Sequence, residues 1–165
     1  MTESRLPPPG TVVRRTTARV LPVRSDGRVL LLHGWDPLKP TTPYWFTIGG
    51  GVETGETVAQ AGSRELREEV GIQLPAEALG EPVATNTIEF EWGGCRIIQH
   101  QTFFAVGVDR VEVSFANQEQ LELETISAHG WWYSDELEAT GQAAHVTIPG
   151  LLRQAVDAIN LRQAS

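Results

Sequence analysis

Apolar and polar residues alternate in several short runs along this chain, which is the pattern of half-buried β-strands. The alternation begins at Thr11, and a second apolar run covers residues 29–32 after an Asp-Gly turn at Asp26-Gly27. This arrangement predicts a hairpin near the N-terminus. Further strands are predicted at 44–48, 83–91, 96–108 and 131–133, the second and third of these being joined at Gly93-Gly94.

Two other segments carry helical spacing. Residues 57–70 contain no proline, and Gly71 follows where a left-handed C-cap is typical. Residues 149–162 form an amphipathic pattern that starts at Pro149, and a shorter helix is indicated after Ser134, which has the chemistry of an N-cap. Strands, helix, strands and helix in this order predict one mixed α+β domain.

Prolines and glycines mark the segments between these elements. Residues 1–10, with Pro7-Pro8-Pro9, are predicted to be a flexible tail that precedes a single domain over residues 11–165. Residues 35–43 contain prolines at three positions and are predicted to form a loop. The aromatic strand 44–48 is expected to stop abruptly at Gly49-Gly50-Gly51, where glycines allow a tight turn with exposed carbonyls.

Composition and charge narrow the class of protein. The 165 residues are 41% hydrophobic and 21% charged, as expected for a domain with its own core, and no stretch approaches the roughly 18 apolar residues of a membrane span. The one cysteine, Cys95, forms no internal disulfide and favours a reducing, cytoplasmic compartment. A formal net charge of −8 disfavours long nucleic acid as a partner, because phosphate neutralisation supplies most of that affinity.

Acidic residues gather in the predicted helix 57–70. Glu65, Glu68 and Glu69 stand at i, i+3 and i+4, so their carboxylates share one helix face. Like charges at this spacing repel, and Mg²⁺ or Mn²⁺, which prefers carboxylate oxygens, would remove the repulsion. A solvated, glutamate-rich surface is the other interpretation of the same spacing.

The residues around this helix distinguish the two interpretations. The segment 50–72 reads Gly50, five residues, Glu56, seven residues, Arg64-Glu65-Leu66, one residue, Glu68-Glu69, one residue, Gly71-Ile72. This spacing matches the Nudix box at every specified position, so the chain resembles the Nudix hydrolase family and its MutT-like members. One difference is Ile48, where relatives commonly have proline before the glycine pair.

The resemblance implies a fold and an activity. Nudix domains are α/β/α sandwiches in which a mixed β-sheet lies between helices. The implied enzyme is a pyrophosphohydrolase that uses Mg²⁺ or Mn²⁺ to cleave a nucleoside diphosphate linked to another moiety, which includes nucleoside triphosphates. The implied partner is a small nucleotide-type molecule, and a homodimer is compatible with the family. The alternative is a catalytically silent Nudix-fold module that binds nucleotides or regulates, although such modules usually lose box glutamates and this chain has kept them.

The resemblance also implies roles for box residues. Glu68 and Glu69 resemble the principal metal ligands, and Glu65 resembles the residue that relatives use as general base or as a further ligand. Arg64 is expected to point elsewhere on the helix and to orient a box glutamate by an ion pair, with Glu56 as the favoured partner. A carbonyl of Gly49 or Gly50 is expected to complete the metal coordination.

Several candidates lie outside the box. Relatives often supply a ligand or base from a late loop, where this chain has Glu122 and Glu124, and a solvated loop is the other interpretation. Trp45 and Phe46 are candidates for stacking on a nucleobase, and Arg28 for reaching a phosphate. Core packing is the favoured interpretation of the two aromatic residues, and a solvent-exposed strand face explains Arg28 equally well. The four histidines and Cys95 show no ligand spacing and are interpreted as structural.

Overall fold

One curled sheet organises the computed structural model, which describes residues 7–108 and 126–164. The strands of the described part are β1 (Val12–Arg24), β2 (Val29–Gly34), β3 (Tyr44–Phe46), β4 (Ile48–Gly51), β5 (Ala84–Trp92), β6 (Cys95–Val108) and β7 (Ile126–Trp132). They lie in the order β3-β2-β1-β6-β5, with β4 paired to β1 and β7 paired to β2. Because β1 and β6 run parallel while the other strand pairs run antiparallel, the sheet is mixed, as expected.

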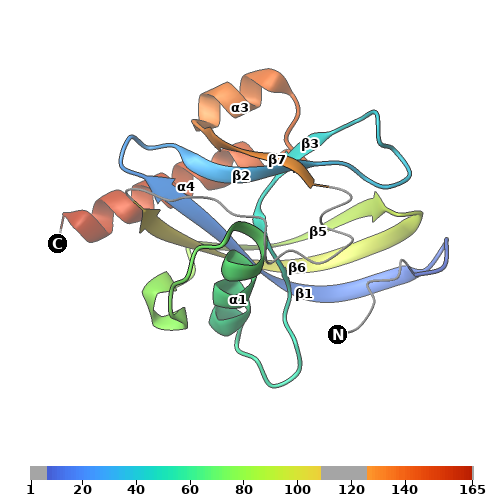
Figure 1. Ribbon diagram of the computed structural model, residues 1–165, viewed down its shortest axis with the longest axis horizontal. Coiled ribbons are helices and arrows are strands. Elements are labelled where there is room, and N and C mark those ends of the chain that lie inside the picture. The colour runs from blue at the N-terminus through green and yellow to red at the C-terminus, as the bar shows by residue number, and fades with distance from the viewer. Residues whose placement is uncertain (1–6, 109–125, 165) are drawn as a thin grey trace.

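Helices cover both faces of this sheet. They are α1 (Val58–Val70), the 3₁₀ turn η1 (Ala76–Leu79), α3 (Ser134–Thr140) and α4 (Ile148–Gln163). Figure 1 shows α1 and α4 on opposite sides of β1, and the alternation of side chains along β1 explains why. Ala18 and Val20 pack in the core under α1, whereas Leu21 and Val23 pack in the core under α4. The expected α/β/α layering is therefore confirmed. None of the described helices is long and apolar enough to cross a membrane.

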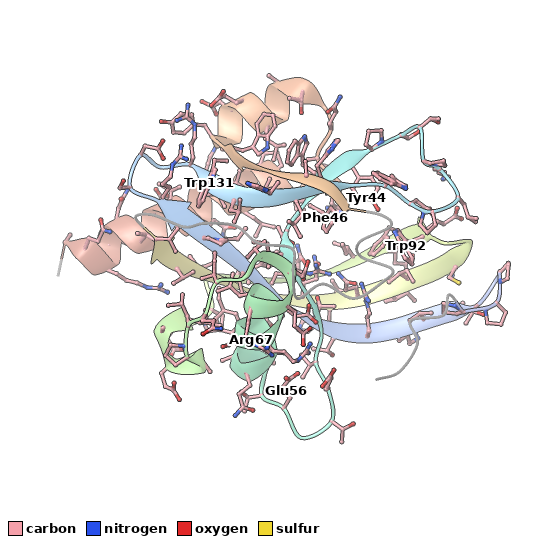
Figure 2. All side chains as sticks on the ribbon, viewed as in Figure 1. Tyr44, Phe46, Glu56, Arg67, Trp92 and Trp131 are labelled. Atoms are coloured by element: carbon pink, nitrogen blue, oxygen red, sulfur yellow. The ribbon has the colours of Figure 1, made fainter. Side chains whose placement is uncertain are left out.

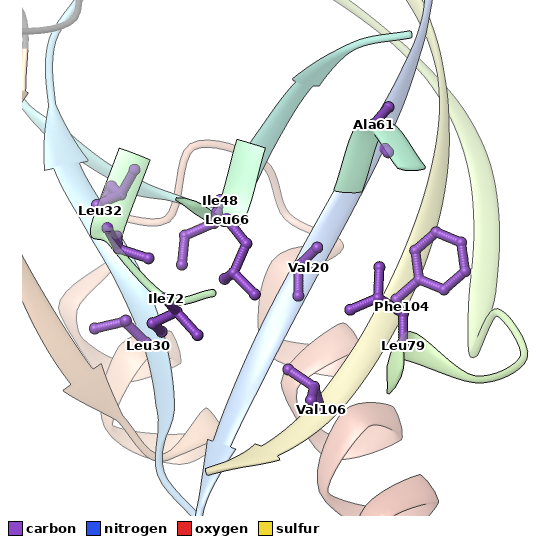
Figure 3. Close-up of a cluster of buried hydrophobic side chains, with 12 residues drawn as sticks. Val20, Leu30, Leu32, Ile48, Ala61, Leu66, Ile72, Leu79, Phe104 and Val106 are labelled. Carbon is purple, nitrogen blue, oxygen red and sulfur yellow. The ribbon is translucent and has the colours of Figure 1, made fainter. Parts of the chain in front are cut away.

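The core under α1 sets the rotation of that helix. Ala61, Leu66 and Val70 are fully buried there against strand residues such as Val20 and Phe104 (Figure 3). Thr57 caps the start of α1 by accepting from the Gln60 N–H, while the Gln60 side chain accepts from the Thr57 N–H. Gly71 ends it at φ 75°. These caps confirm the predicted bounds, and the core turns the remaining helix face toward β4.

The aromatic run before the box differs from the prediction of one strand that stops at the glycines. The structure has two strands, β3 and β4, and the three glycines belong to β4, which pairs with β1 from Thr17↔Gly51 to Val20↔Ile48. Gly49 and Gly50 therefore serve close approach rather than a tight turn, whereas a Cβ on Gly51 would meet nothing within 4 Å. A Cβ at Gly49, whose φ is 149°, would lie 2.0 Å from the Ala18 carbonyl oxygen.

The structure describes the last part of the predicted tail, residues 7–10. The Gly10 N–H donates to the Gly94 carbonyl at 2.9 Å, and the Cys95 thiol contacts the Pro7 and Pro8 carbonyls at 3.6 and 3.5 Å. Residues 7–10 thus lie against the β5–β6 turn.

The start of α3 is a smaller correction. Tyr133, not Ser134, occupies the N-cap position, and no side chain caps the helix there. The Ser134 hydroxyl donates instead to the Pro149 carbonyl at 2.6 Å. This bond joins the first turns of α3 and α4, so the hydroxyl has a tertiary rather than a local partner.

Candidate functional site

Two glutamates of α1 are buried against β4. Glu65 is 8% exposed and Glu69 2% exposed. Glu69 Oε1 accepts a hydrogen bond from the Gly49 N–H at 2.9 Å, so this carboxylate lies on the edge of β4 that faces away from β1. A Cβ on Gly50 would lie 2.4 Å from Glu65 Oε1. The glycine pair of the box is therefore the surface on which both carboxylates rest.

Arg64 lies at the centre of the acidic residues. Its Nε and Nη2 donate to the two oxygens of Glu56 at 2.8 and 3.0 Å, and its Nη1 donates to Glu65 Oε1 at 2.8 Å and Glu68 Oε2 at 3.2 Å. Nη2 also donates to the Gly51 carbonyl at 2.9 Å. Arg64 thus forms the ion pair expected with Glu56, but it does not point elsewhere on the helix. Its guanidinium lies between Glu65 and Glu68 and draws the loop and helix together (Figure 2 labels Glu56 beside α1).

The pKa values of the ionisable residues in this cluster are shifted, that of Glu56 downward and those of Arg64 and Glu68 upward. Hydrogen bonds from Arg64 hold the pKa of Glu56 below its ordinary value, and the same bonds raise the pKa of Arg64. The pKa of Glu68 is raised, first by burial and then by the charge of Glu65, because its contact with Arg64 offsets only part of both. Burial and the Glu65 charge therefore disfavour the charged form of Glu68 more than Arg64 favours it.

Two arginines of β1 approach the cluster from the other side of β4. Arg19 Nη1 donates to the carbonyls of Thr47 and Gly49 at 3.1 and 3.2 Å. Burial lowers the pKa of Arg19 to about 10, whereas the charges of Glu69 and Glu65 raise it. Desolvation likewise lowers the pKa of Arg15, against the charges of the same two glutamates. The carboxylates therefore lie within electrostatic range of strand cations that helix spacing did not indicate.

The Glu56–Arg64 pair should contribute to stability in a pH-dependent way. We expect Glu56→Gln to lower the free energy of unfolding by about 2 kcal/mol at pH 7, because it weakens two hydrogen bonds to a charged group. The folded-state pKa of Glu56 is lowered, so its contribution is present above the unfolded-state pKa of about 4.3 and is lost as pH falls through the folded-state value. Urea unfolding at pH 7 and at pH 3 measures the difference, which should shrink at the lower pH.

Glu53→Gln is the matched control for that measurement. The Glu53 carboxylate also faces Arg64, but at 3.9 Å and with 70% of its side chain exposed. Exposed pairs of this kind contribute little, so this variant should change stability by less than about 0.5 kcal/mol. Equal losses in both variants, or a Glu56→Gln loss that is the same at both pH values, would contradict the assignment.

The donor types of this cluster suit a hard divalent cation. Carboxylate and backbone carbonyl oxygens are the ligands that Mg²⁺ and Mn²⁺ prefer, and the carboxylates of Glu56, Glu65 and Glu68 converge on one guanidinium here. As the side chains lie, however, no three acidic, histidine or cysteine groups of residues 7–108 and 126–164 are arranged to hold an ion. Glu65 and Glu68 are turned toward Arg64, and the Gly49 carbonyl accepts from Arg19.

The structure does not bring every predicted residue to the cluster. Trp45 contacts His33 and Trp132, with ring centroids 4.5 and 5.0 Å apart, and packs in the core under α4. Arg28 is paired with Asp26 at 2.8 Å and lies over the Tyr133 ring. Its neighbour across the hairpin is Arg24, six residues along β1 from the Gly50 register position, or about 20 Å.

The remaining candidates divide between the described and undescribed parts of the chain. Phe46 packs on the core under α1 and contacts Tyr44, with ring centroids 5.8 Å apart. In Figure 2 the side chains of Tyr44, Phe46 and Trp92 of β5 lie near one another and apart from Glu56. Glu122 and Glu124 lie outside the described residues.

Sequence reasoning missed a set of buried polar residues on β1 and its neighbours. Thr17, Gln99 and Gln101 are at most 5% exposed, and Arg19 is 7% exposed. A signal was available in the alternation of segment 96–108, where two glutamines occupy positions that otherwise carry apolar residues.

Two shallow hollows lie elsewhere, one beside Arg67 and Pro75 and one beside Arg14 and His100, and no carboxylate of the cluster lines either of them.

Comparisons with known proteins agree with this geometry. A family model described as the NUDIX domain matches residues 13–148. Dihydroneopterin triphosphate diphosphatase of Escherichia coli (strain K12) is 39% identical over 72 residues, which are 44% of this chain and 45% of the relative. Nucleoside triphosphatase NudI of Escherichia coli O139:H28 is 42% identical over 52 residues, which are 32% of this chain and 37% of the relative. The chain thus spans less than half the length of these curated relatives.

A solved structure extends the similarity to most of the fold. The crystal structure of the MutT protein from Methanosarcina mazei Go1 superimposes with a TM-score of 0.61. The alignment covers 90% of this chain and 96% of that protein, at 18% sequence identity. The shared feature is therefore the arrangement of strands and helices.

Proposed function

This chain belongs to the NUDIX domain family, and from that membership we propose that it is a divalent-metal-dependent pyrophosphohydrolase acting on a small nucleotide. The observation that carries the proposal is the convergence of the box residues at one edge of β4. Glu65 and Glu69 are buried against Gly50 and Gly49, and Arg64 connects Glu56, Glu65 and Glu68. A buried acidic cluster of this kind is costly unless it serves a cation or a reaction.

The relatives support a nucleotide substrate with more than one phosphate. The two curated relatives are named as a dihydroneopterin triphosphate diphosphatase and a nucleoside triphosphatase. Both names describe cleavage of a triphosphate. We therefore propose a nucleoside triphosphate or a similar nucleotide derivative as the substrate class, with Mg²⁺ or Mn²⁺ as the cofactor.

Each box residue has a distinct part in this proposal. Glu68, Glu69 and Glu65 would hold the metal, which when bound supplies charge neutralisation on the phosphate oxygens and lowers the pKa of bound water. Glu65 takes the proton of the attacking water, and its position against Gly50 holds the carboxylate in place. Arg64 orients Glu65 and Glu68 while Glu56 fixes the guanidinium from the other side. Arg19 supplies positive charge next to Gly49.

One observation favours the alternative of a catalytically silent module. The guanidinium of Arg64 lies between Glu65 and Glu68, where it donates to both carboxylates without a metal. The intact box favours the enzyme. A homodimer and a cytoplasmic location remain predictions from the sequence.

Metal binding is the first expected result. The protein should bind Mg²⁺ or Mn²⁺ saturably in calorimetry, and the metal at roughly 100 times its dissociation constant should stabilise the fold by about 2.7 kcal/mol. A panel of nucleoside triphosphates and nucleotide derivatives should then release pyrophosphate or phosphate with the metal present and not with EDTA. Saturable nucleotide binding without turnover of any panel member would favour the silent module. Absence of divalent binding with and without nucleotide would reject the metal-dependent enzyme.

A further inference from the structure

A row of hydrogen-bonded side chains crosses the sheet from β1 to β5. Arg15 Nε donates to Gln99 Oε1 at 2.6 Å, Gln99 Nε2 donates to Gln101 Oε1 at 2.6 Å, and Gln101 Nε2 donates to Asn86 Oδ1 at 2.9 Å. Strand register explains the row, because Arg15 pairs with Gln99 across β1 and β6 and Gln101 pairs with Asn86 across β6 and β5. These four residues are called the amide row below. They all lie on one face of the sheet.

The direction of this row is fixed by its first member. An amide group can accept or donate, so a chain of three amides alone could run either way. Arginine has donors and no acceptor, so Gln99 must turn its oxygen toward Arg15 and its nitrogen toward Gln101. The same constraint passes on to Gln101 and Asn86. Each amide nitrogen therefore points away from Arg15, and the row ends on the NH₂ group of Asn86.

The unused hydrogen-bonding groups of the row are mainly donors. Asn86 retains both hydrogens of its NH₂ group, each glutamine retains one, and the outer nitrogens of Arg15 add more. Two neighbours on the same face, Thr17 and Arg19, are at most 7% exposed, and Thr17 Oγ1 and Arg19 Nε have no hydrogen-bond partner among the described residues. Buried polar atoms of this kind are costly unless a ligand or water satisfies them. The face is thus suited to a ligand rich in acceptors.

The row lies at a suitable distance from the glutamate cluster. Gly51, Thr17, Gln101 and Asn86 occupy one register level on β4, β1, β6 and β5. Neighbouring strands are about 4.8 Å apart, so Gln101 lies about 10 Å and Asn86 about 14 Å from the edge strand that carries the box glycines. The row lies on the sheet face opposite α1, because Thr17 and Arg19 alternate with Ala18 and Val20, and Glu69 reaches the edge of β4 that faces away from β1. Phosphates held at that edge would leave the heterocycle of an extended nucleotide over the amides. Half-buried Ile88 and Phe90 continue the same face of β5 and offer apolar surface beside them.

We propose that Arg15 is a positioning residue that fixes the direction of the amide row, and that the row selects substrates whose heterocycle carries oxo rather than amino groups. The inference rests on the proposed nucleotide substrate and adds its heterocycle class. A carbonyl oxygen accepts from the N–H groups that the row presents, whereas an exocyclic amino group meets them donor to donor. One such hydrogen bond contributes about 1 kcal/mol, which corresponds to a roughly fivefold preference.

Nucleoside monophosphates test this preference without turnover, because they contain no phosphoanhydride bond. Calorimetry should compare inosine with adenosine monophosphate and uridine with cytidine monophosphate, since each pair exchanges an oxo group and its adjacent ring N–H for an amino group and an unprotonated ring nitrogen. The wild-type protein should bind the oxo member of each pair roughly fivefold more tightly. In Arg15→Met the amides are free to reverse, and the ratio should fall to about one. Arg15→Lys keeps a donor at this position and should retain the preference.

Two further variants separate direction from folding. Arg14→Met removes the neighbouring arginine on the opposite face of β1 and should leave the ratio unchanged. Asn86→Asp keeps an acceptor for Gln101 Nε2 but replaces the terminal NH₂ by oxygen, so the ratio should move toward the amino member even if Arg15→Met is unstable. The side-chain amide NMR signals of Gln99 and Gln101 should shift in Arg15→Met and stay in place in Arg15→Lys.

The outcomes test the role of the amide row separately from the proposed pyrophosphohydrolase activity. Equal binding within both pairs by the wild type, or an unchanged ratio in both Arg15→Met and Asn86→Asp, overturns the role of the row, whatever the enzyme hydrolyses. No binding of any of the four monophosphates overturns it as well. Preference for the oxo members in a protein that hydrolyses no nucleotide would instead reject the proposed activity and leave the selective row in place.

Discussion

Glu69→Gln should lower hydrolysis by roughly 1,000-fold or more while the protein stays folded, a loss of about 4 kcal/mol in transition-state stabilisation. Glu69 is 2% exposed and its Oε1 accepts from the Gly49 N–H at 2.9 Å. Glutamine keeps an oxygen for that hydrogen bond and a similar helix propensity, so the contact with β4 survives. What it removes is the negative charge with which the residue would hold a metal ion. The measurement is kcat on the best substrate at saturating Mg²⁺, with a thermal melt to verify folding.

The matched control for this variant is Glu77→Gln. Glu77 belongs to the exposed surface of η1 and has no part in the cluster, so the same chemical change should leave kcat within about twofold. If Glu69→Gln retains near-native kcat, the residue is not a metal ligand. The edge of β4 would then have been assigned the wrong role.

Glu65→Gln should lower kcat far more than it changes KM. A general base accepts its proton only in the transition state, so removing it affects turnover rather than substrate binding, by roughly 100- to 10,000-fold. Glu65 is suited to this part because it is 8% exposed, rests against Gly50 and accepts from Arg64 Nη1 at 2.8 Å. Glutamine preserves that acceptor and the packing. The loss therefore reports the missing carboxylate.

Whether Glu65 is the general base is decided by comparing it with Glu122 and Glu124, which lie outside the described residues. Glu122→Gln and Glu124→Gln should each cost much less turnover than Glu65→Gln, because we place the base in the box. All three variants are measured for kcat and KM at saturating Mg²⁺. If either late-loop variant is slower than Glu65→Gln, the base lies on that loop and Glu65 is at most a ligand.

The amino-acid sequence by itself determined most of the strands and helices, including the acidic helix. Local rules are enough for these features. A capping box at Thr57 and a left-handed Gly71 define α1, and a 3.6-residue repeat places Glu65, Glu68 and Glu69 on one side. The box spacing then identified the family, because all of its positions lie within one continuous segment, residues 50–72.

Tertiary structure decided how those residues are used. Helix periodicity gives no sign that Arg64 lies between Glu65 and Glu68, or that the Gly49 N–H meets Glu69, because both depend on how α1 docks on β4. The tertiary structure also placed Trp45 in the core under α4 and Arg28 at a distant turn. Strand alternation does not indicate which face of a strand meets which helix.

The amide row shows this limit most directly. Arg15 and Gln99 are 84 residues apart, and they meet only because β1 and β6 pair in parallel in one register. A shift of that register by a single residue would turn one strand's side chains to the other face. Non-local strand pairing is set by the burial of the whole core, so it is the tertiary structure that places a buried polar face beside the glutamate cluster.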